Sequence, residues 1–318
     1  MALTKAPAEL LNLDSGLTIT GTTPYLVIGD AGAEDTKIVF DGNAQDYYIG
    51  LDDSADTLLI GRGATVGTTA AMTVDSSSNI GIGTASPGAP LNVTSAYSSG
   101  AITTALKLAT VGGYNANAGT ALDFGSDQGN YSTWLTGRIA APRTGDNWGG
   151  SLVFSTNDNS AATGLATAMT IDHSGQVTMP KQPAFSAMVG STQSNLATGQ
   201  NVDIVFGTEI YDEGSNFASN TFTAPVAGKY QLSYFVRLDA IDTAASYYYL
   251  MIKTSNRNYS PIYAGSTFGA SNPTYMSLTF SVLADMDASD TAKVTFDQTG
   301  GAGQVDVNDG YFTGILVA

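Results

Sequence analysis

The chain has 318 residues and a formal net charge of −16 at pH 7, with one histidine and no cysteine. This charge argues against binding of nucleic acids, which depends on clustered Lys and Arg, and the lack of cysteine excludes a disulfide-stapled fold. Only 13% of the residues are charged and 36 are glycine. Together with the many Thr, Ser, Asn and Asp residues, this composition predicts short strands joined by tight turns, and hence an all-β chain.

The first 22 residues stand apart from the rest of the chain. Leu10, Leu11 and Leu13 form a short helix or a docking strand, or they belong to a fraying chain end. The segment lacks the charged and apolar parts of a signal peptide, and no apolar run reaches membrane-spanning length. We expect residues 1–22 to attach the protein to a larger particle, and we expect synthesis in the cytoplasm without membrane insertion.

Short β-like runs occupy residues 23–95. They are rich in Ile, Val, Leu and Tyr, and clusters of Asp, Gly, Asn and Ser separate them, as turns separate strands. The expected strands lie at residues 25–29, 36–40, 46–51, 56–61, 71–75 and within 79–87. This pattern predicts a first β-rich module.

The same plan recurs in residues 96–180. Strands are expected at 120–124, 132–140, 151–155 and 168–172. The last of these reads A-M-T-I-D and repeats the A-M-T-V-D of residues 71–75, although insertions lengthen the second copy. The repeat predicts a second β-rich module.

The first copy continues with G-I-G-T at 81–84, followed by Pro87, Leu91 and Val93. From M-T-V-D onward this segment resembles the shaft module of tailed-bacteriophage tail fibres, and G-R-I-A at 137–140 resembles a companion module. The second copy departs from the pattern, because no G-I-G-T follows it. Instead V-T-M-P at 177–180 leads directly into residues 181–318, with Pro180 and Pro183 as a hinge. The resemblance implies a virion fibre. Such short, Gly-rich strands bury little apolar surface alone, which favours a fibre of three chains.

The most informative stretch of residues 181–318 is T-F-T-A-P-V-A-G-K-Y-Q-L-S-Y-F-V at 221–236. Pro225 and Gly228 predict a turn. The alternation after it places Tyr230, Leu232, Tyr234 and Val236 on one face of a long, half-buried strand.

This stretch resembles the signature of the tumour-necrosis-factor-like jelly roll, in the form found in the heads of complement component one-q. Other segments match the family in the same order; they are 185–187, 204–206, 211–212, 216–217, 277–283, 290–296 and 310–317. The resemblance implies a trimeric jelly-roll head over residues 181–318, and a family that serves binding more often than catalysis.

Residues for catalysis or metal binding are sparse. The single histidine, His173, falls in a predicted turn, and Gly81-Ile82-Gly83 is not followed by the helix that a phosphate-binding loop requires. The aspartates offer many carboxylate pairs and oxygen ligands, but they lie mostly in turns and match no calcium-loop spacing. We expect no enzymatic activity, no cofactor and no metal site.

The aromatic residues of the head offer a better candidate for function. The run Y-Y-Y-L-M-I at 247–252 predicts a strand with both faces covered. A loop-rich stretch follows it, rich in Asn, Gly and Ser, in which aromatic rings suit recognition of a sugar or a protein surface. The candidate receptor-binding residues are Arg257, Tyr259, Tyr263, Phe268 and Tyr275. Burial between subunits explains the same residues equally well.

The sequence therefore predicts an elongated, all-β, homotrimeric tail fibre of the virion. Residues 1–22 attach it to a tail or other structural protein, residues 23–95 and 96–180 form the shaft, and residues 181–318 form the head. Three heads would bind a glycan or protein of the host-cell surface with avidity. The alternatives are a structural fibre, as a capsid decoration or an adaptor, and a fibre that degrades polysaccharide.

Overall fold

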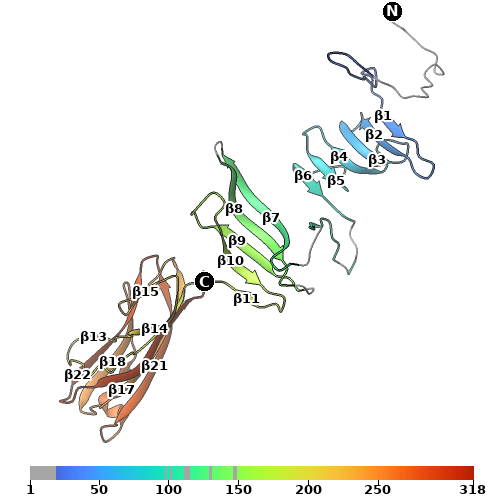
Figure 1. The fold of residues 1–318 in the computed structure, drawn as a ribbon. Helices are drawn as coiled ribbons and strands as arrows, with labels where there is room; N and C mark the ends of the chain where they lie inside the picture. The colour runs from blue at the N-terminus through green and yellow to red at the C-terminus, as the bar shows by residue number, and fades with distance from the viewer. Residues whose placement is uncertain (1–18, 97–98, 101, 111–114, 129–130, 146–148) are drawn as a thin grey trace, which may run out of the picture. The chain divides into compact units, whose positions relative to one another are not determined.

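A computed structural model describes residues 19–96, 99–100, 102–110, 115–128, 131–145 and 149–318. Leu10, Leu11 and Leu13 of the predicted attachment segment lie outside these residues. The described chain is built from strands with one short 3-10 helix (Figure 1), which confirms the predicted all-β class. It divides into two compact units, Met1–Leu108 and Ala109–Ala318. No helix in the described ranges has the length and apolar character needed to cross a membrane.

The first unit contains a six-stranded sheet whose strands follow one another in chain order. The strands are β1 (Thr36–Phe40), β2 (Tyr47–Asp52), β3 (Thr57–Arg62), β4 (Ala70–Val74), β5 (Ile80–Ile82) and β6 (Leu91–Val93). All neighbours are antiparallel except β5 and β6, which are parallel. One face is closed by a small core in which the ring of Tyr48 lies across Gly61, with Leu59 and Val66 beside it.

The predicted strand at residues 25–29 is not formed. The segment is extended coil, and Tyr25 and Val27 are 78% and 69% exposed. A strand requires a neighbouring strand to take up its backbone N–H and C=O groups. In the part of the chain that the structure describes, β1 forms the edge of the sheet and this run does not pair with it.

The second unit begins with a five-stranded antiparallel sheet of spatial order β11-β10-β9-β8-β7. The strands are β7 (Gly119–Gln128), β8 (Tyr131–Pro142), β9 (Leu152–Asn157), β10 (Leu165–Ile171) and β11 (Val177–Thr178). As in the first unit, each strand pairs with the next along the chain. Short connections between consecutive strands favour this meander.

The repeated M-T-V-D and M-T-I-D motifs form the same turn. The Asp75 carboxylate accepts the backbone N–H groups of Ser77 and Asn79 at 2.9 and 2.8 Å. Asp172 accepts those of Ser174 and Gln176, both at 2.8 Å. These hydrogen bonds, led by the one from the fourth residue after each aspartate, lower the pKa of both carboxyl groups. His173 is exposed in the second turn, as predicted.

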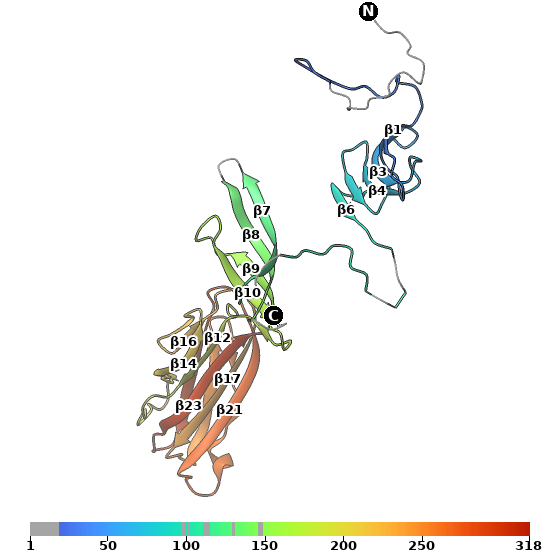
Figure 2. The same ribbon diagram turned by 45° about the vertical axis from the view of Figure 1, so that its right-hand side comes forward.

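Residues 184–316 fold into a two-layer sandwich (Figure 2). One sheet has the order β14-β12-β23-β17-β21. Its strands are β12 (Ala184–Met188), β14 (Thr208–Glu213), β17 (Gly228–Asp239), β21 (Tyr275–Met286) and β23 (Asp306–Leu316). The other sheet has the order β15-β16-β22-β18-β19, and β13 and β20 are attached to β22 and β18. Its strands are β13 (Val202–Asp203), β15 (Phe217–Ala218), β16 (Thr221–Thr223), β18 (Ala245–Thr254), β19 (Asn258–Tyr259), β20 (Ile262–Tyr263) and β22 (Thr291–Gly300).

Consecutive strands of the sandwich repeatedly cross from one sheet to the other. The chain passes from β16 to β17, from β17 to β18, from β20 to β21 and from β21 to β22 by such crossings. This is the connectivity of a jelly roll, and the predicted fold class is confirmed.

The core of the jelly roll is aromatic. Phe185 lies at its centre and stacks on Phe217 and Phe222 at ring-centroid distances of 4.9 and 4.7 Å, while Phe312 meets it edge-on at 5.0 Å. The predicted alternation is also confirmed, because every second residue of β17 from Tyr230 is buried. The alternation therefore directs one face of β17 into this core.

In the run 247–252 the face toward the core is buried as predicted, while on the other face, which we expect to meet neighbouring subunits, Met251 is buried and Tyr247 and Tyr249 are half-buried within the single chain. One smaller prediction is corrected. Pro183, part of the predicted hinge, belongs to the head: its carbonyl accepts the backbone N–H of Leu316 at 3.0 Å. The side chain of Gln182 donates to the Leu316 carbonyl at 2.8 Å. The chain is thus tied to the head from Gln182 onward.

Candidate functional site

The predicted receptor-binding residues lie at two opposite ends of the jelly roll. β18 has ten residues and is therefore about 30 Å long. Phe268, in the 3-10 helix η1 (Gly265–Phe268), packs on Tyr248 near the start of β18. Arg257 lies in the turn after its end, where its N–H donates to Thr254 Oγ1 at 3.0 Å. We call these ends the tip, at Ala245, and the base, where the chain enters at β12.

Three of the predicted residues serve packing. Tyr259, Tyr263 and Phe268 are half-buried against the core of the jelly roll. The rings of Tyr263 and Phe268 lie 6.1 Å apart, and Tyr259 lies opposite Ile252 in the β18–β19 pair. These side chains hold β19, β20 and η1 against the sheet, so little of each is available to a partner.

The base, which includes Arg257, is a hydrogen-bonded turn cluster. Ser255 Oγ donates to Asp290 Oδ1 at 2.6 Å and Asn256 Nδ2 donates to Asp290 Oδ2 at 2.9 Å. The bond from Ser255 is the main reason that the pKa of Asp290 is lowered. Asp285 is paired with Lys229. Among the described residues, no three acidic or histidine side chains gather closely enough to hold a metal ion.

Tyr275 differs from the other predicted residues. It begins β21 at the tip, is 66% exposed, and lies directly opposite Asp239, the last residue of β17. Side chains opposite each other in an antiparallel pair have Cβ atoms about 5 Å apart. The side chains of Tyr275 and Asp239 therefore start from neighbouring positions on the outer face of the sheet.

A row of hydrogen-bonded polar side chains continues from Asp239. Arg237 Nε and Nη2 donate to the Asp239 carboxylate at 3.0 and 3.3 Å, and Asn308 Nδ2 donates to it at 3.2 Å. The hydroxyl of Thr192 donates to Asn308 Oδ1 at 2.7 Å. We call these four residues with Tyr275 the tip patch. Its polar groups are held in place before any ligand arrives, which lowers the entropy cost of binding.

The buried residue Asp242, which is 7% exposed, holds the loops around the tip patch in place. Its carboxylate accepts the backbone N–H groups of Gly303, Ala244 and Ala302 at 2.8, 2.9 and 2.7 Å. These bonds, led by the one from Gly303, lower the pKa of Asp242. Tyr248 donates to the backbone carbonyl of Asp242 at 2.7 Å. The carboxylate thus clamps the loop 300–305 to the loop 240–244.

Sequence reasoning missed four of the five residues of the tip patch. Thr192, Arg237, Asp239 and Asn308 come from three separate parts of the chain. The pairing of β17 with β23 brings Arg237 and Asp239 to Asn308, and the isolated bridge between Gln193 and Val307 brings Thr192 there. Arg237 and Asp239 share a strand face, which an alternating pattern does indicate. No local signal connects them to Asn308, which is 69 residues away from Asp239.

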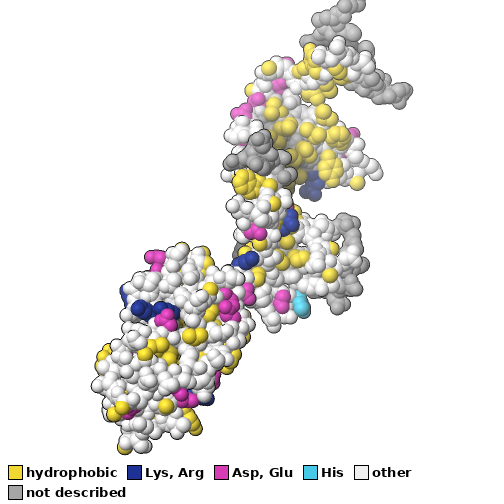
Figure 3. Space-filling view, turned by 60° about the vertical axis from the view of Figure 1, so that its left-hand side comes forward, with side chains coloured by type: hydrophobic (Ala, Val, Ile, Leu, Met, Phe, Trp, Pro, Cys, Tyr) yellow, Lys and Arg dark blue, Asp and Glu magenta, His cyan; other side chains and the backbone are white. Residues whose placement is uncertain are grey.

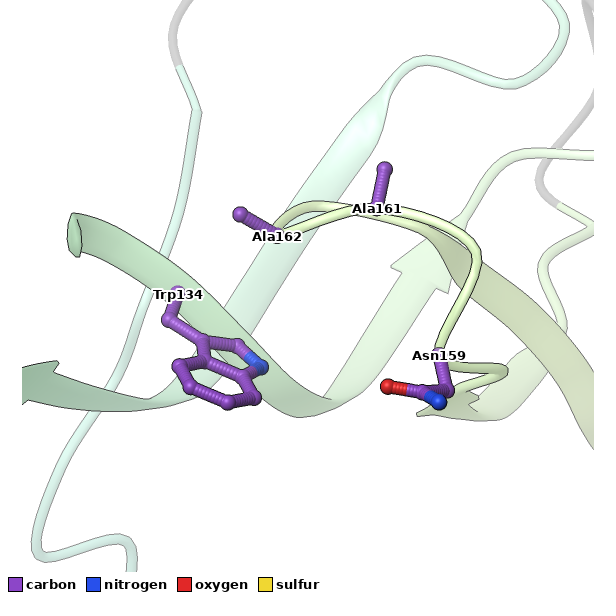
Figure 4. Close-up of a pocket in the computed structure, with 4 residues that line it drawn as sticks. All are labelled: Trp134, Asn159, Ala161 and Ala162. Atoms are coloured by element: carbon purple, nitrogen blue, oxygen red, sulfur yellow. The ribbon is translucent and has the colours of Figure 1, made fainter.

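Two hollows lie elsewhere in the second unit. One, of about 260 Å³, is lined by Trp134 on β8 and by Asn159, Ala161 and Ala162 of the loop between β9 and β10 (Figure 4). The amide of Asn159 points toward the side of the indole ring. The other hollow, of about 410 Å³, lies at the base of the head and is lined in part by Lys181, Glu213 and Val226. Ligand pockets generally measure at least 300 Å³, which the first hollow does not reach.

Comparisons with known proteins show only low similarity in sequence and structure. No family model matches the chain, and no curated protein matches it. Among solved structures, the chain is similar to the globular domain of zebrafish complement 1qA protein, with 18% identity and a TM-score of 0.31 over 43% of this chain and 98% of that one. It is also similar to PRD1 vertex protein P5, with 16% identity and a TM-score of 0.31 over 43% and 97%.

A third similar structure is murine APRIL, with 10% identity and a TM-score of 0.30 over 43% of this chain and 100% of that one. The fold assignment therefore rests on the strand order of this chain, which is that of a jelly roll.

Proposed function

We propose that the protein is a homotrimeric fibre of a phage virion, attached through its N-terminal segment, which binds a host-cell surface receptor with its head. The resemblance of residues 72–93 to tail-fibre shafts and of residues 221–236 to jelly-roll heads supports this function. It acts by adhesion and catalyses no reaction.

The observation that carries the proposal is the position of the tip patch. It lies at the end of the jelly roll opposite to the base, where Gln182 and Pro183 bring the chain in. An exposed tyrosine beside fixed amide, hydroxyl and carboxylate groups suits a ligand that carries hydroxyl groups, such as a saccharide. The ring supplies a flat apolar face, and the polar row supplies donors and acceptors that orient the ligand.

The test measures binding of labelled full-length protein to a panel of bacterial cells, together with its mass in solution. We expect a trimer of about three times 32.7 kDa that labels one host. Tyr275→Ala is expected to lower cell binding at least about tenfold, because loss of one central contact costs more than about 1.4 kcal/mol, and three heads multiply the effect.

The matched control is Tyr211→Ala. Tyr211 is a half-exposed tyrosine of β14, opposite Ser186 and away from the tip. Unchanged binding by the Tyr275 variant, at unchanged mass, would contradict the assignment of the tip patch. A trimer that labels no cell of a panel containing the host favours a structural fibre, and release of soluble saccharide from the host envelope would contradict adhesion without catalysis.

A further inference from the structure

The six-stranded sheet has one face that is largely uncovered in the described part of the chain, with Ile28 of the preceding segment beside Ile38, Ile49 and Leu51. Residues of this face lie opposite one another in rows that cross all six strands. One row consists of Ile38, Ile49, Ile60, Met72, Ile82 and Val93. The next consists of Thr36, Leu51, Leu58, Val74, Ile80 and Leu91. Hydrophobic side chains cover more of the visible surface of this unit than of the head (Figure 3).

The exposed apolar area of this face is large. Nine of its large side chains are each between 38% and 60% exposed; they are Ile38, Phe40, Tyr47, Ile49, Leu51, Leu58, Ile60, Ile82 and Leu91. Together they expose on the order of 800 Å², above the few hundred Å² that monomeric soluble proteins expose in one patch. It is close to what each partner buries in a stable protein interface, roughly 800 Å².

The five-stranded sheet of the second unit repeats this arrangement. Leu122, Ile139, Phe154 and Met169 lie opposite one another across β7, β8, β9 and β10. Leu122 and Phe124 are both 48% exposed. An apolar sheet face needs a second layer to bury it, and each sheet lacks one among the described residues. One cause should explain both.

We infer that the two apolar faces are the surfaces through which copies of this chain assemble, each packing on the same face of the other copies. This inference rests on the proposed fibre of several chains and assigns the residues that hold it together. The second layer that each sheet lacks is supplied by the same sheet in the other copies of the chain.

The chemistry of the first face favours this occupant over others. Of the side chains in its rows, including the third row Phe40–Tyr47–Arg62, only Arg62 at the margin carries a charge. A partner of opposite charge therefore has nothing to recognise, while an identical apolar face is fully complementary. The N-terminal 18 residues contain five leucines, too few to cover both faces.

The absence of cysteine makes the full-length chain suitable for site-specific cross-linking. Ile60→Cys places one thiol in the middle of the apolar face. Val39→Cys is the matched control, because Val39 is 36% exposed and lies opposite Tyr48, on the other face of the same sheet. With a short bismaleimide, we expect the Ile60 variant to form covalently linked copies with at least about tenfold higher yield than the Val39 variant.

Light scattering on the same proteins supplies a second measurement. The unmodified chain should have a mass that is a multiple of 32.7 kDa. On dilution, Ile60→Lys should shift this mass toward that of one chain at a higher protein concentration than Val39→Lys, because a lysine buried between apolar faces is strongly unfavourable. If Ile60→Lys does not fold, cross-linking of the milder cysteine variant still decides.

Several results would overturn the inference. They are a single-chain mass for the unmodified protein, equal cross-linking of both cysteine variants, and a monomer that floats with phosphatidylcholine vesicles, which would make lipid the occupant of the face. Failure of the receptor-binding proposal would be a separate outcome. If Tyr275→Ala leaves cell binding intact while the Ile60→Cys variant cross-links, only the assignment of the tip patch as the receptor site is refuted.

Discussion

Phe185 and Gly314 lie directly opposite each other in the β12–β23 pair, and the buried ring of Phe185 extends across the glycine. A β-carbon at position 314 would overlap the ring and would also come within 2.8 Å of Leu232 Cδ2. The same relationship holds in the first unit, where Tyr48 lies across Gly61. In both places the glycine leaves room for a wholly buried aromatic ring on the neighbouring strand.

Gly314→Ala should therefore destabilise the head. The added methyl group displaces Phe185, the centre of the aromatic core, and overpacking of this kind costs about 1–3 kcal/mol. Chemical denaturation followed by near-UV circular dichroism measures the loss. Gly207→Ala is the control, because its nearest neighbour would be Val205 Cγ1 at 4.0 Å. Equal stability of the two variants would show that the core accommodates the methyl group.

Ser78→Gly should stabilise the first unit. Ser78 adopts a left-handed φ of 66° three residues after Asp75, and the second copy of the turn has Gly175 at φ 80° in the same position. The substitution relieves backbone strain in the folded chain, but glycine also has more freedom in the unfolded chain. The net increase in the free energy of unfolding is about 0.5 kcal/mol. The reverse change, Gly175→Ser, should lower stability by a similar amount. A stabilising effect of both substitutions would contradict the equivalence of the turns.

Local periodicity predicted much of this fold. The alternation from Tyr230 to Val236 predicts β17 and its buried face, because side chains of a strand point to its two faces in turn. Residues 25–29 have equally strand-like composition but form no strand, since pairing depends on a neighbour that local composition does not reveal. Two aromatic residues show the limit for the site. Phe268 packs on Tyr248 while Tyr275 remains exposed, a difference that tertiary structure alone decides.

Asp242→Asn should weaken the tip in a pH-dependent way. The carboxylate accepts three backbone N–H groups, so its pKa is lower in the folded chain than in the unfolded chain. A lowered folded-state pKa contributes stability that is present above about pH 4 and is lost as the pH falls through the folded-state pKa.

The melting temperature of the Asp242 variant should therefore lie below that of the unmodified protein at pH 7, and the two should converge as the pH falls through the folded-state pKa of Asp242. A constant difference between the two proteins over this range would show that the charge of Asp242 does not contribute.

Tyr234→Phe removes a hydrogen bond between the two sheets of the jelly roll. The hydroxyl of Tyr234, in β17, donates to the carbonyl oxygen of Leu250, in β18, at 2.6 Å, and both residues are buried. Loss of such a bond costs about 1 kcal/mol. Burial also raises the pKa of Tyr234. The unfolded chain therefore releases this proton near pH 10 while the folded chain retains it, and the contribution to stability declines above that pH.

Unfolding in urea at pH 7 and at pH 11 tests both effects of this substitution. Tyr234→Phe should be the less stable protein at pH 7, and its disadvantage should shrink at pH 11, because phenylalanine has no proton to lose. Tyr311→Phe, at a position 38% exposed on the outer face, should change neither value appreciably. Parallel behaviour of the Tyr234 variant and the unmodified protein at both pH values would mean that the hydroxyl does not couple the sheets.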